Sequence, residues 1–298
     1  MKNRREFIKT GAMFAAGSML MPMGCSTKTK ETVAEEAATA IVEESTLSVL
    51  AEPGVQVYSV RDALKVDFAG SIKKLADIGY KYVEAYGLGL DGKMLGMSPA
   101  EYKKIVDDTG MKVVSTHATY FTKENANQIA DASLEAGVEF VVTPYLSDEL
   151  RGDYSAVAEN FNTVGEILKS QGLKFGYHNH AFEFEKQGDL VPLEILLKET
   201  QSDLVTFEAD LYWVKKGGVD PMELINKFPG RFSMFHVKDA DKELEQTTVG
   251  SGIIDFPTIM KARDTAGLKY YFIEDERTDD PFANLKANID YMKATDFS

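Results

Sequence analysis

The chain has 298 residues with one cysteine, and its 33 Lys and Arg against 47 Asp and Glu give a formal net charge of −14. Residues 1–30 hold six basic residues and one acidic residue, so the remainder carries 33 − 6 = 27 basic against 47 − 1 = 46 acidic residues, a net charge of −19. Such a surface repels nucleic acid, and a single cysteine excludes an internal disulfide and any thiolate metal site beyond Cys25.

Residues 1–25 have the three parts of an export signal. The adjacent Arg4 and Arg5 resemble a twin-arginine signal. The apolar run at 11–23 is shorter than the roughly 20 residues that span a membrane. The Gly-Cys pair that ends at Cys25 resembles a bacterial lipoprotein cleavage site. We therefore expect an exported protein, periplasmic or membrane-anchored through lipidated Cys25.

Residues 26–53 are small, polar and acidic, which predicts a flexible linker. From residue 54 to 298 the sequence repeats one unit, in which an amphipathic helix is followed by a glycine and then an apolar strand. Six strands have such a leading glycine: Gly79, Gly110, Gly137, Gly172, Gly230 and Gly267.

The pattern predicts eight strands that alternate with eight helices. The strands are expected near 55–59, 81–86, 112–117, 139–143, 174–178, 204–209, 232–237 and 270–274. The helices are expected near 67–78, 99–109, 125–136, 153–171, 192–200, 220–228, 255–266 and 281–293. This alternation predicts an α/β protein with the (β/α)8 TIM-barrel fold. The alternative, a doubly wound open sheet, usually has a glycine-rich phosphate loop after its first strand, and this sequence has none.

Four successive strands end in a pair of polar residues two positions apart: His178 and His180, Glu208 and Asp210, His236 and Lys238, Glu274 and Glu276. Residues i and i+2 of a strand point to the same face, so the members of each pair project together. Earlier strands add three more polar candidates: Arg61, Glu84 and His117. Active sites of (β/α)8 barrels form at the C-terminal ends of the strands, so we expect these residues to converge there. Carboxylates and imidazoles from neighbouring strands can hold a divalent cation.

Four segments of the sequence, EADLYWVKKGGVDP, HVKD, VGSGIIDF and FIEDE, resemble the sugar phosphate isomerase/epimerase family. These are xylose-isomerase-like barrels that include ketose 3-epimerases, hydroxypyruvate isomerases and inosose dehydratases, and the resemblance covers roughly residues 54–295. It implies one bound divalent metal, with ligands Glu, Asp, His and Glu from strands 5 to 8. Asp210, His236 and Glu274 match the last three, and His178 stands where the strand 5 Glu is expected.

The sequence departs from the family at two places. The family's epimerases use the glutamates of strands 5 and 8 as an acid–base pair, and here only Glu274 remains. Trp213 occupies a position where many relatives have histidine. Two imidazoles and two carboxylates, at His178, Asp210, His236 and Glu274, favour Mn, Fe, Co or Zn over Mg.

The remaining candidates have two interpretations each. His180 is expected to act as acid or base or to contact substrate. Lys238 either neutralises Asp239 locally or, as its inward parity favours, contacts a substrate oxygen. Glu208 either orients His178 or His236, or contacts substrate directly. Trp213, in the loop expected after the strand at 204–209, is either a platform for a sugar ring or a buried structural residue. We assign catalytic roles to His180, Glu208, Lys238 and Glu274, and substrate binding to Arg61, Glu84, His117 and Trp213.

The function expected from this resemblance is that of an exported, metal-dependent isomerase or epimerase. It would act on a free sugar or keto-sugar through an enediolate. Elimination on the same fold is the first alternative, as in a lyase or dehydratase that cleaves 3-keto-glycosides. A non-catalytic sugar-binding lipoprotein is the second, because a fold does not fix a function.

Overall fold

The computed structural model describes residues 52–297. The expected export signal at 1–25, including Cys25, and nearly all of the expected linker at 26–53 lie outside the described residues. Within the described part, no helix is both long enough and apolar enough to cross a membrane.

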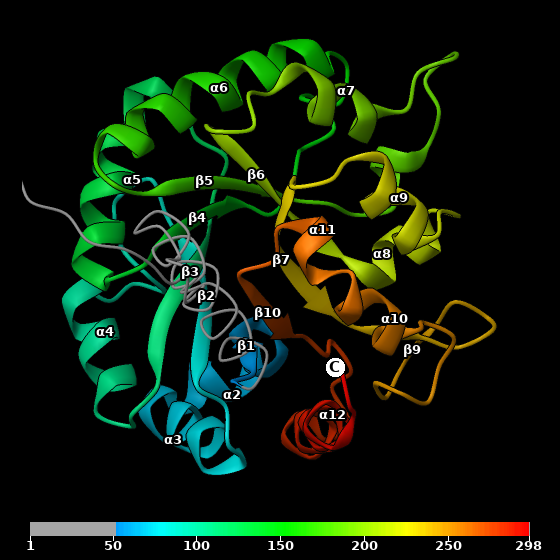
Figure 1. Ribbon diagram of the computed structural model, residues 1–298. Coiled ribbons are helices and arrows are strands. Elements are labelled where there is room, and N and C mark those ends of the chain that lie inside the picture. Colours follow the sequence, from blue (N-terminus) through cyan, green and yellow to red (C-terminus); the bar gives the residue numbers. More distant parts are fainter. Residues whose placement is uncertain (1–51, 298) are drawn as a thin grey trace, which may run out of the picture. The chain divides into compact units, whose positions relative to one another are not determined.

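Eight parallel strands close into a barrel, and helices surround them on the outside (Figure 1). Each barrel strand pairs with the next barrel strand in the sequence, and β1 pairs with β10 to close the barrel. The barrel strands are β1 (Gly54–Gln56), β2 (Tyr82–Leu88), β3 (Lys112–Ala118), β4 (Phe140–Thr143), β5 (Lys174–His178), β6 (Val205–Asp210), β7 (Phe232–Val237) and β10 (Tyr270–Ile273). The predicted (β/α)8 barrel is therefore confirmed.

The helices follow their strands in the order that the sequence predicts. They are α2 (Arg61–Val66), α3 (Phe68–Ile78), α4 (Pro99–Asp107), α5 (Lys123–Ala136), α6 (Tyr154–Ser170), α7 (Pro192–Glu199), α8 (Leu211–Lys216), α9 (Pro221–Lys227), α10 (Phe256–Lys261), α11 (Arg263–Ala266) and α12 (Pro281–Ala294). Local signals set their ends. The Ser98 side chain accepts a hydrogen bond from the Glu101 N–H at the start of α4, and Gly79 ends α3 in the left-handed conformation.

Several segments differ from the sequence-based expectation. The strand expected at 55–59 ends at Gln56, because the Gln56 side chain accepts from the Tyr58 N–H and turns the chain into the 3-10 helix η1 (Val57–Val60). The loop expected after β6 is helix α8. The helix expected at 255–266 is divided into α10 and α11, and a small hairpin of β8 (Asp239–Ala240) and β9 (Gln246–Thr247) follows β7.

The barrel interior has an apolar lower part and a polar upper part. A separate cluster of five buried residues fills the lower part: Val114, Phe140, Val142, Met234 and Phe272. Gly176 of β5 faces this cluster, since a Cβ there would lie 3.3 Å from a Val142 methyl group. Further toward the C-terminal ends of the strands, the same walls carry buried histidines and carboxylates. The fold therefore places a polar layer above a packed floor.

Candidate functional site

A cavity of about 410 Å³ opens at the C-terminal ends of the strands. Its lining combines aromatic side chains with histidines and carboxylates: Tyr58, Tyr86, Gly87, His117, Ala118, Thr119, Pro144, Tyr145, His178, His180, Trp213, Glu274 and Glu276. The lining contains no lysine or arginine among the described residues. The cavity is of the size that binds small molecules in proteins.

Four buried side chains meet beside this cavity, with donor atoms all within 4.8 Å of one another, and the first and last of them line it: His178, Asp210, His236 and Glu274. His178 Nε2 lies 3.4 Å from Asp210 Oδ2. His236 Nδ1 lies 3.1 Å from Glu274 Oε2 and 3.7 Å from Asp210 Oδ2. The structure thus brings together the four residues that the sequence proposed as metal ligands, from the ends of β5, β6, β7 and β10.

The donor atoms of this cluster suit a divalent transition metal. His178 Nε2 and Asp210 Oδ2 are buried and have no hydrogen-bond partner among the described residues. Buried polar atoms without a hydrogen bond are costly, although Asp210 Oδ2 has the Lys238 ammonium at 3.3 Å, and a metal cation would bind both atoms. The second oxygen of Asp210 accepts a hydrogen bond of 2.9 Å from the Trp213 N–H at the start of α8. This helix cap fixes the carboxylate so that its free oxygen faces the cluster.

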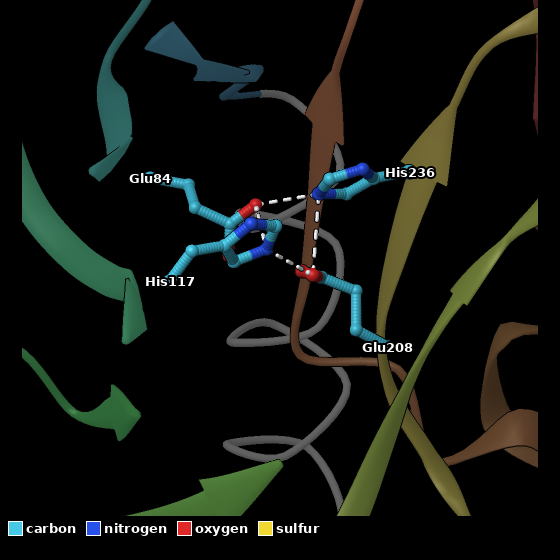
Figure 2. Close-up of side chains that lie close together, drawn as sticks. All are labelled: Glu84, His117, Glu208 and His236. Atoms are coloured by element: carbon cyan, nitrogen blue, oxygen red, sulfur yellow. Dashed lines mark hydrogen bonds and ion pairs between the residues drawn. The ribbon is translucent and has the colours of Figure 1, made fainter. Parts of the chain in front are cut away.

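A second buried network, which we call the lower network, lies beneath the first, the upper cluster, and shares His236 with it. Figure 2 shows the four side chains of the lower network: Glu84, His117, Glu208 and His236. Glu84 Oε2 lies 2.5 Å from His236 Nε2 and 3.4 Å from His117 Nε2. Glu208 Oε2 lies 2.9 Å from His117 Nε2 and 3.2 Å from His236 Nε2. Two carboxylates therefore alternate with two imidazoles, and all four side chains come from opposite walls of the barrel.

The short contacts indicate that protons, not a second metal, join this lower network. Ligands around a tetrahedral ion with bonds near 2.0 Å lie about 3.3 Å apart, whereas Glu84 and His236 approach to 2.5 Å. Gln56 and Ser115 also donate hydrogen bonds of 3.0 and 2.6 Å to the Glu84 carboxylate. When His236 carries its proton on Nε2, the Nδ1 lone pair points toward the upper cluster, as in carboxylate–histidine–metal arrangements.

Lys238 follows β7, and its ammonium group is buried among carboxylates. Its Nζ lies 2.7 Å from Glu274 Oε2, 3.3 Å from Asp210 Oδ2 and 2.6 Å from Glu276 Oε1. Burial lowers the pKa of Lys238, but Asp210, Glu274 and Glu276 outweigh that effect and hold the pKa well above its ordinary value. Lys238 is therefore a fixed positive charge at the edge of the upper cluster.

His180 lies just beyond the end of β5, against the aromatic side of the cavity. Its backbone N–H donates a 2.8 Å hydrogen bond to Glu183, and its ring stacks on Phe182. The rings of Tyr145 and Trp213 lie 5.4 and 5.3 Å from it. Burial, and then the neighbouring His178, lower the pKa of His180 to about 3. The imidazole is therefore neutral, and its buried Nδ1 has no partner among the described residues.

The other candidates differ in their access to the cavity. His117 and Trp213 line it, Trp213 as part of α8 instead of the expected loop. Glu84 and Glu208 are fully buried and do not line it, so their contacts are with the histidines. Glu208 contacts His117 and His236, which corresponds to the orienting alternative, although His178 is not among its partners. Arg61 begins α2 instead of ending a strand, and it bonds the carbonyls of Tyr58 and Glu276.

Three buried or lining residues were not singled out from the sequence. Glu183 holds the His180 backbone, Tyr145 forms part of the cavity wall, and Asp239 accepts four backbone hydrogen bonds beside Lys238. Asp239 lies in the HVKD segment that the resemblance uses. Its place in that segment marks Asp239 as a candidate site residue, but nothing in the sequence distinguishes a carboxylate that holds a loop from a metal ligand.

Comparisons with known proteins agree with this fold. The family described as xylose isomerase-like TIM barrel matches residues 72–295. Two crystal structures from Parabacteroides distasonis, each described as a sugar phosphate isomerase/epimerase, have TM-scores of 0.72 and 0.71. They are 32% and 28% identical, cover 83% of this chain, and are themselves covered to 94% and 99%.

A curated relative, the inosose dehydratase of Clostridium perfringens, is 25% identical over 150 residues, which are 44% of this chain and 50% of that protein. The chain spans about half the length of this relative. The structural neighbours and the dehydratase thus carry the names of enzymes of the same fold. The family match covers most of the barrel, and the chain belongs to the xylose isomerase-like TIM barrel family.

Proposed function

We propose that this protein is a divalent-metal-dependent enzyme that removes a proton next to the carbonyl group of a neutral sugar or keto-sugar. The observation that carries the proposal is the convergence of His178, Asp210, His236 and Glu274 beside the cavity, with two buried donor atoms that lack hydrogen-bond partners among the described residues. The relatives named sugar phosphate isomerase/epimerase and inosose dehydratase support the same class of chemistry.

The side chains around the cluster have separate roles in this proposal. When bound, the cation would polarise a substrate carbonyl and its neighbouring hydroxyl, which acidifies the adjacent C–H. We assign proton removal to His180, because it borders the cavity and has a ring nitrogen without a hydrogen-bond partner among the described residues. Trp213 and Tyr145 flank His180 and offer flat surfaces to the apolar face of a sugar ring.

The charge of the cavity favours a neutral substrate over a phosphorylated one. Phosphate groups are usually held by arginine, lysine or a helix N-terminus. The cavity lining has no lysine or arginine among the described residues, and it includes two acidic side chains, Glu274 and Glu276. The nearest ammonium group, that of Lys238, is already paired with three carboxylates. A free sugar or an oxidised glycoside therefore fits best.

The number of free bases bears on the reaction type. Inversion at one carbon requires proton carriers on both faces of the substrate. Here Glu274 is bound by Lys238 and His236, and His117 by Glu208, which leaves His180 as the uncommitted base. One base suffices to move a proton between neighbouring carbons, as in an isomerase. It also suffices for elimination, so a lyase acting on 3-keto-glycosides is the second candidate.

The test combines metal analysis with NMR in D2O on a panel of ketoses and 3-keto-glycosides. We expect about one transition-metal ion per chain, lost in Asp210→Asn. His180→Gln should retain the metal but lose at least about 100-fold in turnover, the usual contribution of a positioned base. An isomerase would leave solvent deuterium in the sugar, whereas a lyase would release the leaving group.

Stoichiometric metal in Asp210→Asn would contradict the ligand assignment. Saturable sugar binding with neither exchange nor elimination would favour the non-catalytic alternative.

Export and lipidation of Cys25 remain part of the proposal and have their own test. In the native host or a bacterial expression host, the protein should incorporate labelled palmitate, and globomycin should block its processing. Cys25→Ala should abolish the labelling.

A further inference from the structure

Lys238 and a metal ion would use the same two oxygen atoms. Glu274 Oε2 and Asp210 Oδ2 face the two imidazoles of the upper cluster, at 3.1 Å from His236 Nδ1 and 3.4 Å from His178 Nε2, respectively. The Lys238 ammonium lies 2.7 Å from the first oxygen and 3.3 Å from the second. A cation coordinated by these oxygens would therefore lie directly beside a fixed positive charge.

A third carboxylate gives Lys238 an alternative position. Glu276 Oε1 lies 2.6 Å from Lys238 Nζ, and the Glu276 side chain is 39% exposed, whereas that of Asp210 is fully buried. Glu276 also lines the cavity. A small rotation of the flexible lysine side chain can keep the contact with Glu276 while it leaves Asp210 and Glu274.

We propose that Lys238 and the divalent cation exchange at this site: Lys238 neutralises Asp210 and Glu274 when the metal is absent, and it pairs with Glu276 alone when the metal is bound. This inference rests on the metal site of the proposed function. It makes Lys238 an internal competitor that lowers metal affinity and stabilises the metal-free protein. It also places a lysine ammonium at the cavity wall only in the metal-loaded state.

The direction of the effect follows from charge. Removing a positive charge within a few ångströms of a buried divalent ion strengthens the binding of that ion. The same removal leaves three carboxylates without their cation in the metal-free protein, which is strongly destabilising. A lysine that merely packs against Trp213 and Tyr212 would change stability in the same direction with and without metal.

The experiment titrates Mn2+ into the EDTA-treated full chain by calorimetry and measures the melting temperature with and without Mn2+. Lys238→Met should bind Mn2+ at least about tenfold more tightly than the wild type. Its metal-free Tm should fall by on the order of 10 °C, and saturating Mn2+ should restore most of the loss. Lys261→Met, a substitution at an exposed position of α10, is the matched control and should change neither quantity.

Two further variants separate the loss of charge at Lys238 from a general loss of folding. Lys238→Gln keeps a hydrogen-bond donor without the charge and should change Mn2+ affinity in the same direction as Lys238→Met. Glu276→Gln removes the alternative partner of Lys238, so it should weaken Mn2+ binding in the wild-type background. The same substitution should have a smaller effect when Lys238 is already Met, which measures the coupling between the two residues.

The outcomes separate this inference from the metal site itself. Equal or weaker Mn2+ binding by both Lys238 variants would overturn the exchange and leave the metal site in place. If neither the wild type nor any Lys238 variant binds Mn2+, Zn2+ or Co2+, the metal site and the exchange are both wrong. Tighter binding with a larger Mn2+-induced rise in Tm supports the exchange.

Discussion

Glu183 is a buried carboxylate that supports His180 without lining the cavity. It lies in the 3-10 helix η2 (Phe182–Phe184), hydrogen-bonded to the Tyr177 hydroxyl and to the His180 backbone N–H. Burial raises the pKa of Glu183 to about 7 from its ordinary value near 4.5, and these hydrogen bonds offset only part of the increase. A buried carboxylate that ionises near neutral pH makes stability depend on pH.

The sign of this dependence follows from the raised pKa. The folded protein binds the Glu183 proton more tightly than the unfolded chain, so this contribution to stability is complete below about pH 4.5. It is lost as the pH rises through about 7, and the loss amounts to about 3 kcal/mol.

Glu183→Gln should therefore gain stability relative to the wild type as the pH rises from 5 to 8. The amide keeps an acceptor for the His180 N–H but has no charge to bury. Urea unfolding at several pH values measures the difference, with the exposed Glu185→Gln as control. If the difference in unfolding free energy between the wild type and the variant is constant from pH 5 to 8, the raised pKa of Glu183 is wrong.

At the scale of elements, Asp239 determines the course of the chain after β7. Its carboxylate accepts hydrogen bonds of 2.8 to 3.2 Å from the N–H groups of Ala240, Gly250, Gly252 and Ile254. The close packing of this loop against Asp239 and Ala240 leaves no room for a side chain at Gly252, where a Cβ would lie 2.1 Å from the Ala240 carbonyl oxygen. One carboxylate thus holds the loop that leads from the β8–β9 hairpin to α10.

Asp239→Asn should lower the free energy of unfolding by about 2 to 4 kcal/mol. The reason is that the amide cannot accept four hydrogen bonds and lacks the charge that strengthens them. Denaturant unfolding measures the loss, and the exposed Asp264→Asn serves as control. Metal content should change much less than in Asp210→Asn. A stability change below about 0.5 kcal/mol would show that water or neighbouring groups replace these bonds.

Elements with strong periodicity were predictable from the sequence. The strands expected at 174–178 and 232–237 agree with β5 and β7, because continuous apolar runs after a glycine leave little ambiguity. The α8 helix was not predictable in the same way. It begins directly after β6 without a linker, with Asp210 as its N-cap, so the strand pattern masks the helix start.

The candidate site was predictable to a similar extent. Strand parity and the family resemblance identified the four residues that meet beside the cavity. Depth along the barrel was not accessible, because it depends on the register between distant strands. Glu84 therefore lies beneath His236 and not in the cavity, and Glu208 contacts histidines from two different strands.

At the scale of the whole molecule, the lower network joins opposite walls of the barrel. Glu84 and His117 belong to β2 and β3, whereas Glu208 and His236 belong to β6 and β7, and other strands separate the two pairs on either side. The barrel's apolar floor is small, so these ionic contacts form a considerable part of the contact across its interior. All four side chains are at least nine-tenths buried.

Removing one member of this network should therefore destabilise the whole barrel and not one loop. Glu84→Ala removes one of the two carboxylates at His236 Nε2 and the acceptor of the Ser115 hydroxyl, and the loss of one member of a buried ion pair costs about 3 to 5 kcal/mol. Glu84→Gln keeps an acceptor for His236 and should cost only about 1 to 2 kcal/mol. Ser115→Ala, which removes one neutral donor to the same carboxylate, should cost about 1 kcal/mol. Urea unfolding gives the three free energies, and hydrogen exchange shows whether β2 and β7 lose protection together, as a contact across the barrel requires. If Glu84→Ala stays within about 1 kcal/mol of the wild type, or if only β2 loses protection, the network contributes local order and does not hold the two walls together.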